Sequence, residues 1–266
     1  MTPSEKPKTY RLIALSRDDA VVTITLGNPP VNALAWDVVR ELSQAFDEIE
    51  GDEEVGAAVV TGGDSRFFSA GADVGEFSAL SHAEVTDYLG AGSDLFNRIE
   101  TFPKPVVAAV NGFALGGGAE LSFVCDVRVA AESARFGLPE ITLGLIPGWG
   151  GLQRLTHLIG KGRALEAALT GRPLEAREAL AAGLVTKVTP DAELAGQAME
   201  VAKGLATRPA LAVAAIKQRI VAGLGRSQGD SVRGDLEAFL HTLKTDDAKE
   251  GIAAFLEKRP PRFHGR

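Results

Sequence analysis

The stretch PVVAAVNGFALGGGAEL, residues 105–121, places an apolar run and three consecutive glycines directly before a glutamate. The run at 105–110 predicts a buried strand, and the residues from about 117 to 125 predict a helix. Glycines between two such elements give up side-chain packing and carry a large entropy cost on folding. We therefore expect this turn to need unusual backbone angles or a very close approach of another group to the main chain.

The same order of elements recurs along the first half of the chain. AVVTITL (20–26), GAAVVTGG (56–63) and VRVAA (127–131) predict strands, while 36–49 and about 82–100 predict amphipathic helices. Strand, loop and helix alternate through about residue 145, which indicates an α/β core.

The character of the chain changes after residue 151. GLVTKV (183–188) predicts a strand, and the rest of this part is rich in helical patterns. The predicted helices are 151–159, 162–170, 174–182, 191–206, 209–222, 230–244 and 247–258. We predict a core over residues 1–195 that holds the active site, and a helical C-terminal region over residues 196–266.

The composition is that of a folded, acidic protein of 266 residues, with 45% hydrophobic and 24% charged residues and a net charge of −7. An acidic chain repels phosphate backbones, which argues against a nucleic-acid partner. The single Cys125 allows no intramolecular disulfide, and the first residues carry no targeting pattern. No run of about 18 apolar residues predicts a membrane span. We expect a soluble, cytoplasmic protein without a nucleic-acid or membrane partner.

Several common motifs are missing from the sequence. The glycine turn lacks the third glycine of a dinucleotide fingerprint, and no Gly-Lys-Ser/Thr follows any glycine loop. Ser69 lacks the first glycine of a nucleophile elbow. His82, His157, His241 and His264 show no metal-ligand spacing to each other or to the cysteine. We therefore expect neither a metal nor a nucleotide cofactor.

Two turns with small residues follow two of the predicted buried strands. FFSAGADV (67–74) comes after AAVVTG, and ALGGGAEL (114–121) comes after PVVAAV. Free N–H groups at a helix start carry partial positive charge, and two such turns side by side would form an oxyanion hole. Ala70, Gly71, Ala72, Gly116 and Gly117 would let a substrate oxygen reach the main chain. The alternative is that both are tight turns whose small residues serve packing.

Two glutamates stand in apolar surroundings. Glu120 follows Gly117 by about one helical turn, and Glu140 lies in FGLPEITLG. A carboxylate in such a setting has a raised proton affinity and can act as acid or base near neutral pH. The alternative for each is a helix cap or an ion pair.

The sequence resembles the enoyl-CoA hydratase/isomerase (crotonase) superfamily. The motifs are NPPVNAL, FSAGADV, PVVAAVNGFALGGGAEL, CDVRVAAESARFGLPEITLGLIPGWGG and LTGRPLEAREALAAGLV, in this order. The resemblance implies a spiral of ββα units, a C-terminal helical region used in trimerisation, and a homotrimer or homohexamer. It implies an acyl-CoA thioester substrate, so that CoA enters as part of the substrate and no separate cofactor is needed.

The resemblance also implies roles for individual residues. The N–H groups of Ala72 and Gly117 would hold the thioester oxygen. Glu140 would donate the α-proton, both glutamates would activate water, and the backbone of Gly148 would orient that water. The two acids together favour an enoyl-CoA hydratase; the alternative is a Δ3,Δ2-enoyl-CoA isomerase or another crotonase reaction.

The implied CoA contacts are Ala70, whose carbonyl would meet the adenine, together with Asp73, Arg66 and Lys258, the last from a neighbouring subunit. Arg66 and Lys258 are equally compatible with solvated surface charges. Two residues depart from the family pattern. Gly75 replaces a basic residue, so that one phosphate contact is missing or is supplied elsewhere. Trp149 replaces a small residue, where it narrows the acyl pocket or packs.

Two further functions from other classes are an RNA-binding protein with residual hydratase activity and a non-catalytic acyl-CoA binding protein. The net charge of −7 and the lack of a basic stripe on the predicted helices count against the first. The two glutamates beside the two turns count against the second.

Overall fold

The computed structural model describes residues 10–265, in which a six-stranded sheet forms the centre of the core. The first two strands pair antiparallel and all other neighbours are parallel. In spatial order the strands are β1 (Ile13–Asp18), β2 (Val21–Leu26), β3 (Ala57–Thr61), β5 (Val106–Val110), β7 (Val127–Ala131) and β10 (Lys187–Thr189).

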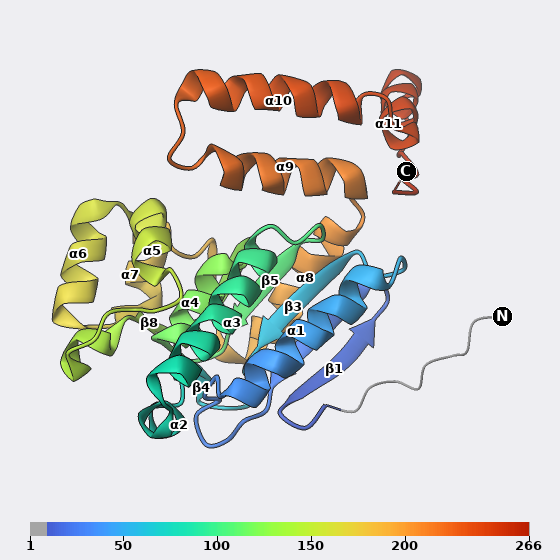
Figure 1. Ribbon diagram of the computed structural model, residues 1–266. Coiled ribbons are helices and arrows are strands. Elements are labelled where there is room, and N and C mark those ends of the chain that lie inside the picture. Colours follow the sequence, from blue (N-terminus) through green and yellow to red (C-terminus); the bar gives the residue numbers. More distant parts are fainter. Residues whose placement is uncertain (1–9, 266) are drawn as a thin grey trace.

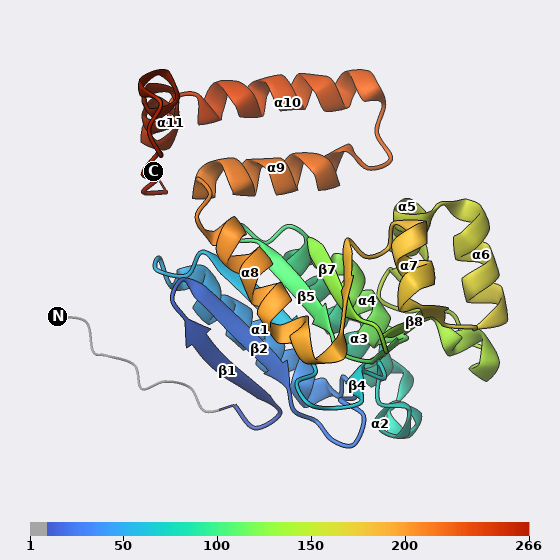
Figure 2. The ribbon, with the colours of Figure 1, turned by 180° about the vertical axis from the view of Figure 1, so that it is seen from behind.

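Helices cover both faces of this sheet, which explains why its central strands read as continuous apolar runs. Along β5, Val106, Ala108 and Val110 face one apolar cluster, and Val107 and Ala109 face the other. Figure 1 shows α1 (Trp36–Gly51), α3 (His82–Glu100) and α4 (Gly117–Val124) on the first face, and Figure 2 shows α8 (Leu194–Ala206) across the second.

A second, four-stranded sheet lies beside the ends of the first. Its strands are β4 (Phe67–Ser69), β6 (Phe113–Leu115), β8 (Arg135–Gly137) and β9 (Leu174–Glu175). After each of β3, β5 and β7 the chain adds one strand of this sheet and then continues toward a helix, so the ββα units are confirmed. These strands have two or three residues each, too few to show a period of two in the sequence.

The residues after β8 form a lobe beside the second sheet (Figure 1). The short 3-10 helix η1 (Pro139–Leu143) leads to α5 (Gly151–Ile159), α6 (Lys161–Thr170) and α7 (Ala176–Ala182). The small helix α2 (Val74–Ala79) precedes α3, and η2 (Asp191–Glu193) precedes α8. The helices predicted for this part of the chain are confirmed, with ends shifted by a few residues.

The last three helices project from the core (Figures 1 and 2). They are α9 (Ala210–Gly223), α10 (Gln228–Thr242) and α11 (Asp246–Glu257). Lys217 ties α9 to the core, because its Nζ donates to Asp126 Oδ2 at 2.7 Å and to the Lys104 carbonyl at 3.0 Å. The domain boundary at residue 195 stays a prediction; the helix that contains it, α8, packs on the sheet.

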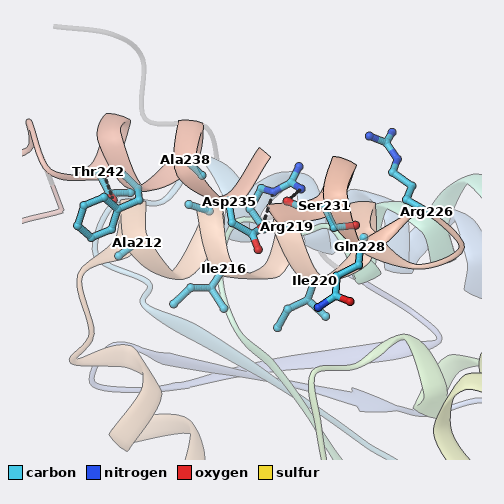
Figure 3. Close-up of a pocket in the computed structure, with 13 residues that line it drawn as sticks. Ala212, Ile216, Arg219, Ile220, Arg226, Gln228, Ser231, Asp235, Ala238 and Thr242 are labelled. Carbon is cyan, nitrogen blue, oxygen red and sulfur yellow. Dashed lines mark hydrogen bonds and ion pairs between the residues drawn. The ribbon is translucent and has the colours of Figure 1, made fainter. Parts of the chain in front are cut away.

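An arginine joins α9 to α10. Figure 3 shows Arg219 pairing with Asp235 at 3.0 Å and donating to the Ser231 carbonyl at 3.0 Å. The two helices expose large apolar side chains to solvent, among them Ile220, 65% exposed, and Phe239, 61% exposed. An apolar face of this kind on a single chain marks a surface that binds something.

Candidate active site

The two turns and the two glutamates meet at one cavity of about 250 Å³. Eight of the residues named from the sequence line it, namely Ala70, Ala72, Gly116, Gly117, Glu120, Glu140, Gly148 and Trp149. Two larger hollows, of about 660 and 550 Å³, lie along α9 and α10 and between α9 and the core, and neither glutamate lines them. The chemistry-bearing residues therefore identify the smaller cavity as the candidate site.

The two small-residue turns are in direct contact. A Cβ built on Gly71 would lie 2.7 Å from the amide nitrogen of Gly117, closer than real Cβ atoms approach, and φ at Gly71 is +90°. A Cβ built on Gly117 would lie 3.4 Å from the amide nitrogen of Ala72. No hydrogen bond from the Ala72 or Gly117 amide to another group is found in the described part of the chain. Two neighbouring free donors are what an oxyanion hole requires.

Each of the three glycines lies against a different neighbour, which explains why glycine is required there despite its entropy cost on folding. Gly116 has φ +51°, a conformation that side chains disfavour, and a Cβ there would lie 3.0 Å from Glu140 Oε1. A Cβ on Gly117 would lie 2.3 Å from the Trp149 ring, and one on Gly118 would lie 2.2 Å from the Ser69 carbonyl. The close approach of another group to the main chain, expected from the sequence, is thus present at each of the three glycines.

Glu120 is buried on α4, with 1% of its surface exposed. Its Oε1 accepts from the amides of Trp149 at 2.9 Å and Gly151 at 2.7 Å. Burial raises the pKa of Glu120 to about 7; the two N–H donors lower it and the neighbouring Glu140 raises it. This carboxyl therefore exchanges a proton near neutral pH, as the apolar sequence context predicted.

Glu140 reaches the cavity from η1, the first turn of which begins at Pro139. Its Oε2 is buried, and no group in residues 10–265 forms a hydrogen bond with it. Burial raises the pKa of this carboxyl above its ordinary value. An unpaired, half-buried carboxyl that faces a cavity is suited to carry a proton and pass it to a bound molecule.

The loop that holds Glu120 depends on a residue that the sequence analysis missed. Arg154 of α5 donates from Nη1 at 2.6 Å to the carbonyl of Trp149, the residue whose amide donates to Glu120. Its Nη2 pairs with Glu100 at 2.9 Å and donates to Asn97 Oδ1 at 2.8 Å, both on α3. Only the glycines of PGWGG marked this loop in the sequence, and nothing local singled out the arginine.

The predicted CoA contacts are spread more widely. Ala70 lines the cavity, whereas Asp73 caps α2 by accepting from the Glu76 amide at 3.1 Å. Arg66 is exposed and lies 5.0 Å from the centre of the Phe113 ring. Lys258 ends α11, on the projecting helices far from α2 in Figure 1. The contacts of these residues with CoA stay predictions.

Within residues 10–265, no group of three or more His, Cys, Asp and Glu side chains is arranged to hold a metal ion. No helix in this range is long and apolar enough to cross a bilayer. That the reaction needs no metal or separate cofactor stays a prediction.

The site can therefore stabilise negative charge on an oxygen and move protons close to it. The two free amides would face the oxygen, and the two carboxyls lie on the walls of the same small cavity. This combination suits reactions that pass through an enolate, with proton transfer at the neighbouring carbons.

Comparison with known proteins gives relatives along nearly the whole chain. A sequence profile described as enoyl-CoA hydratase/isomerase matches residues 16–266. A probable enoyl-CoA hydratase of Bacillus subtilis is 42% identical over 95% of this chain and 98% of its own. A short-chain-enoyl-CoA hydratase of Clostridium acetobutylicum is 40% identical over 93% of this chain and 95% of its own.

Solved structures agree with the sequence relatives. The crystal structure of an enoyl-CoA hydratase from Bacillus anthracis superposes with a TM-score of 0.92 at 37% identity, covering 96% of this chain and 100% of that one. The predicted α/β fold with a helical C-terminal region is confirmed by this match.

Proposed function

The chain belongs to the enoyl-CoA hydratase/isomerase family, and we propose that it is an enoyl-CoA hydratase. The reaction is the reversible syn addition of water to a trans-2-enoyl-CoA, which gives a 3-hydroxyacyl-CoA. The observation that carries this proposal is that Glu120 and Glu140 line one cavity together with the turns of Ala72 and Gly117.

Activation begins at the thioester oxygen. The amides of Ala72 and Gly117 would donate to it and stabilise the charge that develops when a nucleophile adds to the β-carbon. Because both donors belong to fixed turns, they need no reorganisation during the reaction. Gly148 would orient the water from its place on the cavity wall.

The proton transfers balance across the two glutamates. Glu120 would take a proton from water as the water oxygen bonds to the β-carbon, and the electrons of the double bond move to the thioester oxygen. The resulting enolate would take the proton of Glu140 at its α-carbon. Water has then supplied one hydroxyl and one proton, and the glutamate pair holds as many protons as before.

An isomerase is the alternative that the same site allows. A single acid that moves a proton between two carbons suffices for that reaction, and Glu140, with its unpaired oxygen, meets this need alone. The hydrogen-bonded, buried Glu120 favours hydration, because hydration needs a second group that takes a proton from water and isomerisation does not.

The experiment is to mix the purified protein with crotonyl-CoA, to follow the loss of the conjugated enoyl-thioester absorbance, and to identify the product by mass. Rapid loss with a gain of one water supports the hydratase. No loss with crotonyl-CoA, together with conversion of a 3-enoyl-CoA to the conjugated isomer, would favour the isomerase instead.

The assembly follows from the projecting helices. We infer that α9–α11 join copies of this chain into a trimer or a pair of trimers, because such exposed residues as Ile220 and Phe239 need an apolar partner. Lys258, at the end of α11, would then reach the CoA of a neighbouring subunit, and Arg66 and Asp73 would contribute from the same subunit. The protein would work in the cytoplasm, without a separate cofactor, nucleic acid or membrane partner.

A further inference from the structure

The side chain of Trp149 forms part of the cavity wall next to the catalytic groups. The indole is 2% exposed, and its ring lies edge-on to Tyr88 at 5.4 Å and Phe96 at 5.2 Å between centroids. Its amide is one of the two donors that hold Glu120, so the ring and this carboxyl are fixed by the same residue.

Two glycines make room for this ring. A Cβ on Gly92 of α3 would lie 2.3 Å from Trp149 Nε1, and a Cβ on Gly117 of α4 would lie 2.3 Å from Cζ3 on the other side. Neither contact is possible for a real side chain, so the indole fills the space between two helices. Packed interiors resist such displacement, and the ring is therefore a rigid wall.

The proposed mechanism brings the acyl chain close to this wall. On the proposed mechanism the thioester oxygen lies at the amides of Ala72 and Gly117, and the β-carbon lies beside Glu120. Residue 149 lines the same cavity and donates its amide to that carboxyl, so it lies beside the position of the β-carbon as well. Carbons beyond the β-carbon would meet the indole.

The volume leaves little space for a long chain. The cavity, at about 250 Å³, is smaller than most ligand pockets, which span roughly 300 to 1,000 Å³. A cavity of this size suits a crotonyl thioester with its attacking water better than a long acyl chain.

We propose that the Trp149 side chain closes the acyl end of the cavity and restricts the substrate to short enoyl groups such as crotonyl. This inference rests on the proposed hydratase function and adds the substrate class and the residue that sets it. Gly92 and Gly117 are also required, because a side chain at either position would displace the indole ring.

The test measures kcat/KM for trans-2-enoyl-CoA substrates of four, six and eight carbons in the wild type, Trp149→Ala and Trp149→Phe. The ratio of the eight-carbon to the four-carbon value is compared, because it does not depend on the fraction of folded enzyme. We expect this ratio to be below 0.1 in the wild type and to rise at least tenfold in Trp149→Ala. Trp149→Phe, which conserves an aromatic wall, should lie between the two.

Phe102→Ala serves as the matched control. This phenylalanine is a buried aromatic residue, 1% exposed, that packs on Phe46 and does not line the cavity. Its ratio should equal that of the wild type. A ratio that stays at the wild-type value in both Trp149 variants would overturn the inference, and so would a wild type that favours eight carbons. Either result would place the acyl group along Leu143 and Ile146, which also line the cavity. If no enoyl-CoA of any length is hydrated, the proposed hydratase function is wrong, and the inference about Trp149, which rests on it, is wrong as well.

Discussion

Arg154 and Glu120 both form hydrogen bonds with the main chain of Trp149. The Nη1 group of Arg154 donates to the Trp149 carbonyl at 2.6 Å, and Glu120 Oε1 accepts from the amides of Trp149 at 2.9 Å and Gly151 at 2.7 Å. The arginine is itself held by Glu100 of α3. A chain of contacts from α3 through α5 thus fixes the carboxyl of α4 that faces the cavity.

Arg154→Met should lower kcat by about 10-fold to 100-fold, because the loop amides lose their fixed direction and Glu120 moves with them. Arg154→Lys, which keeps the positive charge, should recover part of the loss. The measurement is steady-state hydration of crotonyl-CoA, with folding checked by circular dichroism.

The control for this prediction is Arg98→Met. Arg98 lies on α3, the helix that Arg154 contacts, and pairs with Asp47 and Glu50 at 2.6 Å, but it does not line the cavity. Equal losses in the Arg98 and Arg154 variants would show that the effect is general destabilisation and not positioning.

Glu140→Gln should remove proton delivery to the α-carbon. We expect kcat to fall by about 10²-fold to 10⁴-fold with KM nearly unchanged, because the amide keeps the shape of the side chain without its acid function. The measurement is turnover of crotonyl-CoA beside a direct binding assay with a saturated acyl-CoA. A variant that hydrates at the wild-type rate would contradict the role given to Glu140.

The activity of the wild type should fall on the acid side of about pH 7. Burial raises the pKa of Glu120 to this value, and below it the carboxyl is protonated and unable to accept a proton from water. The profile of kcat/KM against pH should also fall at alkaline pH, where the pair loses its last proton. The positive charge of Arg154 lowers the pKa of Glu120, so in Arg154→Met the acid limb should move to higher pH.

Glu120→Gln should become more stable than the wild type as the pH rises. A carboxyl whose pKa is raised by burial favours the protonated folded state, so the wild type loses stability between the ordinary pKa near 4.5 and about 7. An amide carries no such penalty, and its oxygen can still accept from the two loop amides. We expect the variant to be more stable than the wild type at pH 8, by on the order of 2 kcal/mol, with the difference shrinking toward pH 5.

Urea denaturation at pH 8, 6 and 5 measures this difference. Glu178→Gln is the control of opposite sign, because Arg172 holds the pKa of Glu178 below its ordinary value. That exposed variant should not gain stability at pH 8. A Glu120→Gln difference that is the same at all three pH values would rule out titration of Glu120 as its cause.

Ile220→Glu should dissociate the oligomer. Ile220 is 65% exposed on α9, and a charge at this place would have to be buried in an interface without a partner. Light scattering after size exclusion should show a smaller particle than the wild type. Gln218→Glu adds the same charge at an exposed position of the same helix and should leave the mass unchanged; an unchanged mass for both would contradict the assigned interface.

The elements of the core were largely predictable because their signals are local. The apolar run at 106–110 and the helical spacing of 36–49 arise from neighbours a few residues apart, and both predictions are confirmed by β5 and α1. The short strands of the second sheet were missed, since two or three residues cannot show a period.

The sequence alone determined which groups could do the chemistry: two turns of small residues, and two glutamates in apolar surroundings. Only the tertiary structure decided that the turns touch, that Arg154 supports the loop around Glu120, and that Trp149 fills the space opened by Gly92. Apart from the bond between Arg154 and Trp149, these contacts join residues 29 to 57 positions apart. No local pattern encodes them, because they depend on how whole helices pack against one another, and packing is a property of the assembled core.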